Sequence, residues 1–514
     1  MASEAPPGGA QTARLRLLGA AGVLLILAGW AAASLLAGSY FVPAPWTTIA
    51  DTVALLGSGF TWTQILITVL RVCIGFLFGL VAGLAAGIAM GGRRELDALF
   101  KPLVVFFQGM PPLLWAIPLV ALMGIGHIPT IVVIALITFP LVAVTIREGM
   151  STLPRELAEM LSIFAPGFVP RMRELVLPHL APFLGASLKA GLVLAVKASV
   201  TAEYFGANDG IGFQIQAAYM TLRIRTLFSW ALVLILVILA VNRVLPRIRL
   251  GRPAVARRRP RRPAGAGETR KLDAVPGVES DAGYRVENDA GYRVDLRNVL
   301  TSRAGTARVS MDHVAFAYRG GPRILEDATL EVTDREIAVI TGESGVGKTT
   351  FLKLVASLLK PVQGSIQCPA RIGFVFQDDR LLPWRSVLEN TAIPLMHQGY
   401  AREDARRLAQ ELLSEAGLAG EGAKNPDELS GGMKKRAALA RCFARLPDAI
   451  LLDEPFSGLH AEARAHLWAM FLRLRSLHPV PTLIVTHYPQ EITSLSACRG
   501  YRLEGKPARM VRAT

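Results

Sequence analysis

The sequence predicts two domains of different class: an all-α membrane domain with six spanning helices, followed by an α/β domain with a phosphate-binding loop. The chain has 514 residues, of which 52% are hydrophobic and only 19% are charged, a composition typical of a chain that is partly embedded in a membrane. The long apolar stretches fall within residues 1–250. From about residue 307 alternating strands and helical spacing replace them, and the segment GESGVGKTT follows an apolar run.

Residues 1–250 are predicted to be a transmembrane domain, because six stretches reach the length of about 20 residues that crosses a bilayer. Prolines interrupt the third stretch, and a few residues separate it from the fourth. Arg14 and Arg16 precede the first stretch, as in a signal peptide, but its apolar part exceeds the usual 7–15 residues or so, which favours an uncleaved helix. The predicted spans are 17–39, 64–91, 103–123, 128–146, 183–205 and 227–246.

The basic residues predict the orientation of these spans, since Lys and Arg concentrate in cytoplasmic loops. With six spans, the basic clusters before the first and after the second, fourth and sixth all fall on one side. Arg223 and Arg225, before the last span, are the exception. We therefore expect a multi-pass protein of the cell (inner) membrane, with both chain ends and everything after residue 250 in the cytoplasm.

Residues 251–306 are predicted to be a polybasic, disordered linker, because RPAVARRRPRRPAGAG is too rich in Pro, Arg and Gly to bury a core. Residues 251–271 hold 8 basic residues and 1 acidic residue beside the last span, which predicts contact with anionic lipids. An eight-residue duplication begins at Asp281 and Asp289; a tolerated insertion is favoured over a docking motif. The net charge of +16 thus indicates orientation and lipid contact, and no nucleic-acid partner.

GESGVGKTT has the spacing of a P-loop and stands between a predicted strand and a predicted helix. Its glycines let backbone N–H groups surround phosphates, and the start of the following helix adds a favourable dipole. Lys348 would reach the β and γ phosphates, and Thr349 would hold Mg²⁺. The predicted nucleotide-binding residues of this loop are Gly342, Glu343, Ser344, Gly345, Val346, Gly347, Lys348, Thr349 and Thr350.

Two further motifs support a nucleotide-hydrolysing domain. ILLDEP is an apolar strand that ends in Asp453, a ligand for Mg²⁺, and Glu454, which would polarise the attacking water as general base. LSGGM precedes a basic helix and can present a hydroxyl and bare N–H groups to an anion. Alone, the acids of ILLDEP could be an ordinary solvated pair and LSGGM an ordinary helix cap. Their order after the P-loop argues against a chance match. The residues of the second motif are Leu429, Ser430, Gly431, Gly432 and Met433.

With these motifs, residues 309–514 resemble the nucleotide-binding domain of ABC (ATP-binding cassette) transporters, within a predicted domain of residues 307–514. The resemblance implies that Tyr318 stacks on adenine. It also implies that Gln377, in VFQDDRLLPWRSVLEN, senses Mg²⁺ and the γ-phosphate beside the membrane-domain contact. His487, in LIVTHYPQE, would contact the γ-phosphate.

The sequence departs from this family at two positions. His460 follows SGL where an aspartate is common, and Tyr488 stands where an aspartate commonly follows the switch histidine. The first departure bears on the usual contact between two ATP sites. Neither removes a residue that hydrolysis needs.

Residues 60–245 contain the segments GGRRELDALFKPLVVFFQGMPPLLWAIPLVALMGIG and AEYFGANDGIGFQIQAA. With these segments the region is similar to permeases of the nitrate/sulfonate/taurine importers, which depend on a binding protein. The segment PRELAEMLSIFAPGFVPRMRELVLPHLAP resembles the coupling loop of these permeases, although its pattern is degenerate. Family register places the conserved acid at Glu159, whereas Glu156 begins a segment that reads more like E-A-A. Ala165 stands at the expected glycine position, and the L-P ends at Pro178. The resemblance implies a short helix that docks into the ATP-binding domain near its glutamine loop.

Three charged residues fall in or beside the fifth span: Lys189, Lys197 and Glu203. Intramembrane charges are costly and usually face a cavity or a partner. Two interpretations stay open, namely internal pairing and the attraction of an anion by Lys197 or Lys189. Lys197 and Glu203 are therefore candidate residues of a substrate path.

Taken together, the resemblances imply a membrane domain like that of type I ABC importers, fused to a P-loop NTPase domain of the ABC type. They imply an ATP hydrolase that uses ATP and Mg²⁺ and imports a small anionic solute from a separate periplasmic or lipid-anchored binding protein. ABC-type sites form between two cassettes, so the chain would act as a homodimer or with a homologous half-transporter.

Two alternative functions are disfavoured. A half-transporter that exports a small molecule is commonly built as such a fusion, but its helices extend deep into the cytoplasm over about 300 residues, whereas these spans are near the minimum of about 20. A non-transporting ATPase, regulatory or acting on nucleic acid, is disfavoured by six spans on the same chain.

Overall fold

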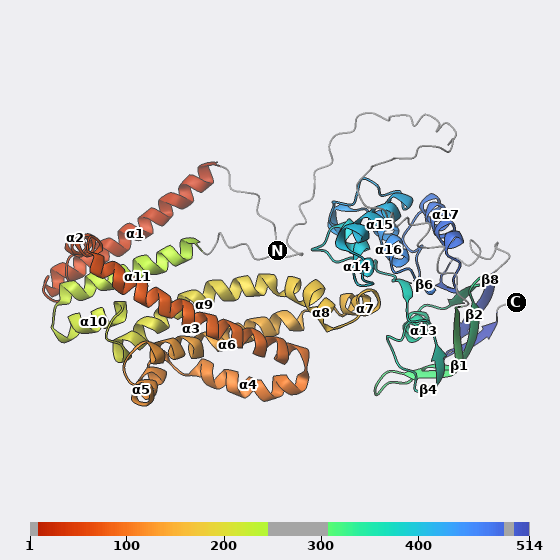
Figure 1. The fold of residues 1–514 in the computed structure, drawn as a ribbon. Helices are drawn as coiled ribbons and strands as arrows, with labels where there is room; N and C mark the ends of the chain where they lie inside the picture. Colours follow the sequence, from red (N-terminus) through yellow and green to blue (C-terminus); the bar gives the residue numbers. More distant parts are fainter. Residues whose placement is uncertain (1–8, 245–306, 488–497, 513–514) are drawn as a thin grey trace. The chain divides into compact units, whose positions relative to one another are not determined.

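The chain divides into two compact units, each of which is described by itself (Figure 1). The first unit comprises Met1–Leu153 and His179–Pro253, and the second comprises Pro154–Pro178 and Ala254–Thr514. The second unit therefore includes the predicted coupling loop. The predicted linker with its duplication, and Tyr488, lie outside the described residues. The computed structural model describes residues 9–244, 307–487 and 498–512.

The first unit is helical throughout its described part. Five of its helices are long and apolar enough to cross a membrane, and a sixth span results if the bent pair α4 and α5 is counted as one. The helices are α1 (Gly9–Ala37), α2 (Pro45–Leu56), α3 (Gly59–Gly92), α4 (Arg94–Gly109), α5 (Pro112–Met123), α6 (His127–Ser151), α9 (Leu177–Gly206), α10 (Ile211–Met220) and α11 (Ile224–Val244).

The third predicted span, 103–123, is interrupted by prolines as expected. It is split between α4 and α5, which are bent by 94° at Met110 and Pro111. Proline has no backbone N–H and disfavours the helical conformation at the residue before it. Met110 accordingly adopts φ −90° and ψ 123°, and the chain restarts as a helix with Pro112 in its first turn.

Helices α3 and α6 pack side by side along a stripe of glycines (Figure 1). A Cβ at Gly83 would lie 2.6 Å from the Cβ of Val142 and 2.8 Å from the carbonyl oxygen of Phe139. Residues four apart share one helix face, and glycine lets two backbones approach closely. The glycines of α3 whose added Cβ would meet α6 are Gly75, Gly79, Gly83, Gly87 and Gly91.

The second unit contains two sheets over its described residues. A three-stranded antiparallel sheet has the order β2-β1-β4, and a six-stranded sheet has the order β5-β6-β7-β3-β8-β9 and is parallel except for its last pair. Strands β3 and β6 are buried apolar runs, which is typical of central parallel strands. The strands are β1 (Arg308–Ala317), β2 (Arg323–Thr333), β3 (Ile337–Gly342), β4 (Gln363–Gln367), β5 (Ile372–Val375), β6 (Ala449–Asp453), β7 (Thr482–Val485), β8 (Cys498–Glu504) and β9 (Arg509–Arg512).

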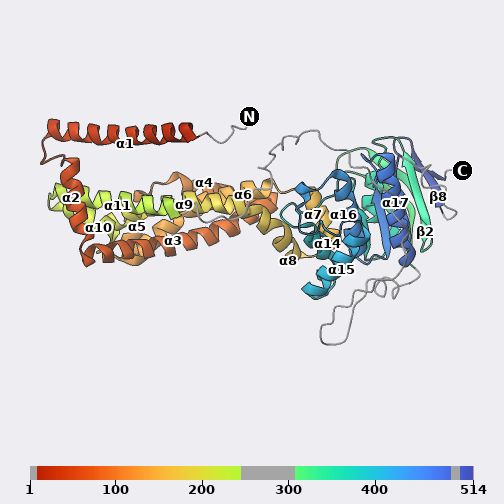
Figure 2. The same ribbon diagram turned by 90° about the horizontal axis from the view of Figure 1, so that it is seen from above.

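The main core of this unit joins the parallel sheet to the helices that follow its strands. Ile450 of β6 packs in one cluster with Leu412, Phe443 and Phe471, which come from three different helices. Helices α14, α15 and α16 gather away from β1 and β2 (Figures 1 and 2). The helices are α7 (Arg155–Phe164), α8 (Phe168–Arg171), the π-helical turn η1 (Met172–Val176), α13 (Lys348–Val355), α14 (Val387–Met396), α15 (Arg402–Glu415), the 3-10 turn η3 (Pro426–Glu428), α16 (Gly431–Ala444) and α17 (Ala461–Leu477).

Candidate functional site

The P-loop lies between β3 and α13, where the sequence predicts it. Gly345 and Gly347 adopt φ +79° and +113°, conformations that glycine tolerates and that fold the loop tightly. The Nζ of Lys348 donates hydrogen bonds to the carbonyl oxygens of Gly342 and Glu343, each at 2.9 Å. The loop is thus formed around its own lysine.

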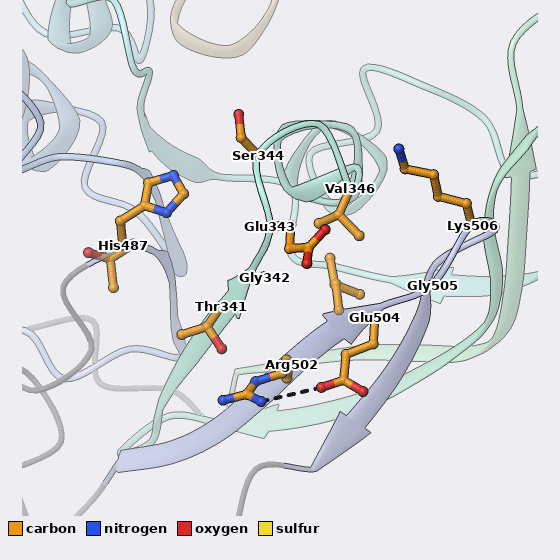
Figure 3. A pocket seen from close by; sticks show the side chains of 12 residues that line it. Thr341, Gly342, Glu343, Ser344, Val346, His487, Arg502, Glu504, Gly505 and Lys506 are labelled. Carbon is orange, nitrogen blue, oxygen red and sulfur yellow. Dashed lines mark hydrogen bonds and ion pairs between the residues drawn. The ribbon is translucent and has the colours of Figure 1, made fainter.

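A cavity of about 770 Å³ borders this loop (Figure 3). Glu343 and Ser344 line it from the P-loop, His487 lines it from the end of β7, and Lys506 lines it from the turn between β8 and β9. Backbone N–H groups of a P-loop together with cationic side chains are suited to polyanions such as phosphates. The cavity is therefore a candidate for phosphate binding.

The general-base candidate Glu454 is held by two neighbouring loops. Its Oε2 accepts a hydrogen bond from Nε2 of Gln377 at 3.2 Å, and its Oε1 lies 3.0 Å from Nε2 of His487. These three residues follow β6, β5 and β7, which are adjacent parallel strands, so their carboxyl ends meet at one sheet edge. The sequence-predicted catalytic residues are thereby brought together.

Asp453 at the end of β6 is suited to a divalent cation. Its side chain is 2% exposed, and among the described residues its Oδ1 has no hydrogen-bond partner. Burial raises the pKa of this carboxyl to about 6, although a hydrogen bond with Thr349 acts in the opposite direction. A buried, unpartnered carboxylate oxygen next to a hydroxyl fits the oxygen preference of Mg²⁺. Thr349, Asp453 and Gln377 are the residues that could hold the ion.

Tyr318 stands just past β1 with its ring partly exposed, 45% of the residue being accessible. Its hydroxyl lies 3.2 Å from Oγ1 of Thr350 in the P-loop helix. The ring is packed edge-on against Phe316. An accessible aromatic face beside the phosphate loop is available for stacking on a base.

The signature motif LSGGM forms the start of α16. Ser430 is the N-cap, and its Oγ accepts a hydrogen bond from the backbone N–H of Met433 at 3.3 Å. Within the described part of the chain, no hydrogen bond or ion pair joins residues 429–433 to the P-loop. His460 caps α17 in the same way, with Nδ1 accepting from the N–H of Ala463.

The predicted coupling loop contacts the α/β domain through Glu159 of α7. Its carboxylate pairs with Nζ of Lys353 at 2.9 Å and with Nη1 of Arg380 at 2.8 Å. Burial alone raises the pKa of Glu159, but the hydrogen bonds from the two cations outweigh it, and the pKa lies below its usual value. Glu156 is exposed and contributes only its carbonyl oxygen, which accepts from Arg380 at 3.3 Å.

The turn after α7 uses a different glycine from the one expected. Ala165 has φ −145°, which any residue adopts, whereas Gly167 has φ +123° and leads into α8. The left-handed turn is thus displaced by two residues from the family position. Pro178 lies two residues after the π-helical turn η1, inside a helix that runs without a break from Phe168 to Gly206.

Several contact residues of this loop and its docking surface were not predicted from the sequence. Glu174 is buried in η1, and its Oε2 accepts from Nε and Nη2 of Arg385 at 3.1 and 2.9 Å. Nε1 of Trp384 donates to the carbonyl oxygen of Glu174. Arg441 of α16 stacks over the ring of Phe164 at 4.8 Å. An acid between two arginines and the run LVL was the available signal in the sequence, and it did not identify a partner.

In the first unit, Glu203 has internal partners. Its side chain is fully buried, pairs with Arg71 at 3.2 Å and accepts a hydrogen bond from Thr68 at 3.0 Å. Lys189 and Lys197 are exposed on α9, and neither forms an ion pair among the described residues. Internal pairing thus accounts for Glu203. Among the described residues it does not account for Lys189 and Lys197.

Comparisons with known proteins match both halves of the chain. A family model described as "ABC transporter" matches residues 325–457, and one described as "Binding-protein-dependent transport system inner membrane component" matches residues 75–249. The aliphatic sulfonates import ATP-binding protein SsuB 1 of Rhodococcus jostii is 38% identical over 198 residues, which cover 37% of this chain and 78% of that protein. The formylaminopyrimidine import ATP-binding protein ThiZ of Halalkalibacterium halodurans is 35% identical over 190 residues, covering 37% and 76% respectively.

Proposed function

Because the chain belongs to the ABC transporter family, with a permease domain and an ATP-binding domain on one polypeptide, we propose that it imports a small anionic solute delivered by a separate binding protein. The chain is a multi-pass membrane protein, and its ATP hydrolysis is coupled to transport. Import is supported by the relatives, whose names assign them to the import of aliphatic sulfonates and formylaminopyrimidine. The description of the permease family supports a binding protein.

The observation that supports ATP hydrolysis is the position of Glu454 between Gln377 and His487. A γ-phosphate near this edge would take over the hydrogen bonds of Gln377 and His487, which frees the carboxylate to accept a proton from the attacking water. Lys348 would exchange its two carbonyl partners for phosphate oxygens. Mg²⁺, held by Thr349 and Asp453, would neutralise charge on the phosphates.

A second cassette is needed to complete each site in this proposal. Ser430 exposes its hydroxyl and the start of α16, yet the P-loop of the same chain makes no contact with it among the described residues. A helix start binds anions, so Ser430 would act on ATP held by the Lys348 loop of another copy. We therefore propose a homodimer, with the ATP-binding domains and both chain ends on the cytoplasmic side.

The two lysines of α9 support an anionic solute. Lys189 and Lys197 lie eight residues apart, about 12 Å along the helix axis, on exposed positions of a membrane-spanning helix. A cation facing lipid at mid-membrane costs about 2.5–3.5 kcal/mol, so this face is better suited to an aqueous path. An anion on that path would be attracted by Lys197.

The test is uptake into proteoliposomes that contain the full chain and ATP on the cytoplasmic side, with the binding protein encoded beside it supplied outside. An aliphatic sulfonate, nitrate and the neutral formylaminopyrimidine serve as solutes. We expect uptake of an anion that requires ATP and the binding protein, is lost in Glu454→Gln and is retained in Glu403→Gln, a matched change on the exposed face of α15. Uptake without a binding protein, or efflux alone, would contradict import.

Lys197→Glu tests the anion separately. We expect it to reduce anion uptake by about tenfold or more, since a charge reversal on the path replaces attraction with repulsion. ATP hydrolysis by the purified chain should change little. Unchanged uptake of the anion in this variant would reject the path through Lys197 and leave the ATP-driven import itself standing.

A further inference from the structure

Arg441 is a fully buried arginine in α16, the helix whose N-cap is Ser430. Its Nη1 donates to the carbonyl oxygen of Arg380 at 2.7 Å, and its Nη2 donates to that of Asp379 at 2.8 Å. Burial lowers the pKa of Arg441 to about 10, so the guanidinium stays charged at neutral pH. The side chain therefore fixes the backbone immediately after Gln377.

The same guanidinium reaches the coupling loop. Its carbon atom Cζ lies 4.8 Å from the centre of the Phe164 ring, and Phe164 is the fully buried last residue of α7. A guanidinium over an aromatic face is attracted by the ring quadrupole, more strongly when water is excluded. One side chain thus joins three elements, namely α16, the segment after β5 and α7.

Arg380 receives contacts from both sides of this junction. Its backbone is held by Arg441, while its own guanidinium pairs with Glu159 of α7 and lies 3.9 Å from the ring centre of Phe376. Its φ of +48° is a left-handed conformation that L residues rarely adopt, which the surrounding contacts must stabilise. A shift of α16 would therefore move Arg380 and the carboxylate to which it is bound.

We propose that Arg441 is a positioning residue that transmits the state of the signature motif to the coupling loop, in parallel with Gln377. This inference rests on the proposed two-cassette function, in which Ser430 contacts ATP bound by the partner copy. Gln377 responds to the γ-phosphate in its own site, and α16 responds to the ATP bound by the partner copy. Both responses act on residues 378–380, so one coupling loop responds to two nucleotides.

The geometry requires an arginine. The guanidinium of Arg441 donates to two carbonyl oxygens and at the same time faces an aromatic ring. A planar guanidinium has the donors and the flat face for all three contacts, whereas a lysine ammonium does not. Arg441→Lys keeps the charge but removes the fork and the stacking. Phe164→Leu removes the ring from the other end and leaves every side chain of the α/β domain in place. Arg445→Lys is the matched control, because Arg445 is also largely buried and lies at the C-terminal end of α16.

The experiment measures hydrogen–deuterium exchange of the full chain in lipid nanodiscs, with and without Mg²⁺ and ATP. All variants carry Glu454→Gln, so that ATP is not consumed. Two peptides are followed: the coupling loop, 154–178, and the P-loop, 342–350. We expect ATP to change exchange in both. In Arg441→Lys and in Phe164→Leu the change in the coupling loop should shrink about threefold or more, while P-loop protection and the Arg445→Lys control stay as in the parent.

Three outcomes would overturn the inference. If the coupling loop of Arg441→Lys and Phe164→Leu responds as in the parent, Arg441 transmits nothing. If Arg441→Lys loses P-loop protection and Phe164→Leu responds normally, Arg441 is merely structural. If the parent itself shows no ATP-dependent change in the coupling loop while its P-loop is protected, the proposed coupling fails and this inference fails with it.

Discussion

The glycine stripe of α3 makes a sharp prediction about the membrane unit, which Gly83→Ala tests. The added Cβ would lie 2.6 Å from the Cβ of Val142 and 2.8 Å from the carbonyl oxygen of Phe139, whereas ordinary contact begins at 3.4 Å. One of these atoms belongs to the backbone, so no rotation of a side chain relieves the overlap. The two helices have to separate.

The expected cost follows from this overlap. Forcing one extra methyl group into a packed interface costs about 1–3 kcal/mol. The higher helix propensity of alanine stabilises a helix by up to about 1 kcal/mol relative to glycine at a position without contacts. Gly92→Ala, at the C-terminal end of the same helix, is the control for the substitution itself, because a Cβ there meets nothing within 4 Å. Since the gain in propensity applies to helix interiors, the overlap at Gly83 has to exceed it for Gly83→Ala to melt below this control.

Thermal unfolding of the full chain in nanodiscs, followed by tryptophan fluorescence, measures this difference. A destabilisation of 1 kcal/mol lowers the Tm of a domain of 150–250 residues by about 2–4 °C. We expect Gly83→Ala to melt several degrees below Gly92→Ala, and Gly92→Ala to melt at or slightly above the parent. A Tm of Gly83→Ala equal to that of Gly92→Ala would refute the close approach of α3 and α6.

Three further predictions concern the second unit. Glu454→Gln should slow ATP hydrolysis by about 10²–10⁴-fold and leave binding of a fluorescent ATP analogue intact; loss of binding instead would indicate a damaged fold. Mg²⁺ needs an ionised ligand, and the pKa of Asp453 is raised to about 6. The Mg²⁺ concentration for half-maximal nucleotide binding should therefore rise as the pH falls through about 6 and stay level above 7. A flat profile from pH 8 to 5 would argue against Asp453 as a ligand. Glu159→Ala should lower uptake per ATP hydrolysed by about tenfold or more, because it loses two charge-assisted hydrogen bonds. Glu156→Ala should change this ratio little. Equal effects of the two substitutions would show that the carboxylate contacts of Glu159 are not decisive.

Much of the ATP site could be predicted from the sequence, because its chemistry is carried by short segments at strand ends. The glycine spacing of the P-loop and the acids after ILL specify local backbone shape and burial, and both act over a few residues. The parallel order of β5, β6 and β7 then brings Gln377, Glu454 and His487 together.

The remaining features depend on partners far apart in the sequence. Glu174 acquires its role from Arg385, and Phe164 from Arg441, more than 200 residues away in each case. No local pattern encodes such pairs. The prolines after Met110 predicted an interruption of the third span, but the 94° angle between α4 and α5 depends on packing that hydropathy does not describe.

Two polar side chains of the candidate ATP site already have partners within the described chain. Lys348 is bonded to two carbonyl oxygens of its own loop, and Glu454 is bonded to Gln377 and His487. An arriving nucleotide would have to displace these contacts, so its net binding free energy would be smaller than its number of contacts suggests. When ADP and phosphate depart, Lys348 and Glu454 would return to these partners, which would favour release of the product.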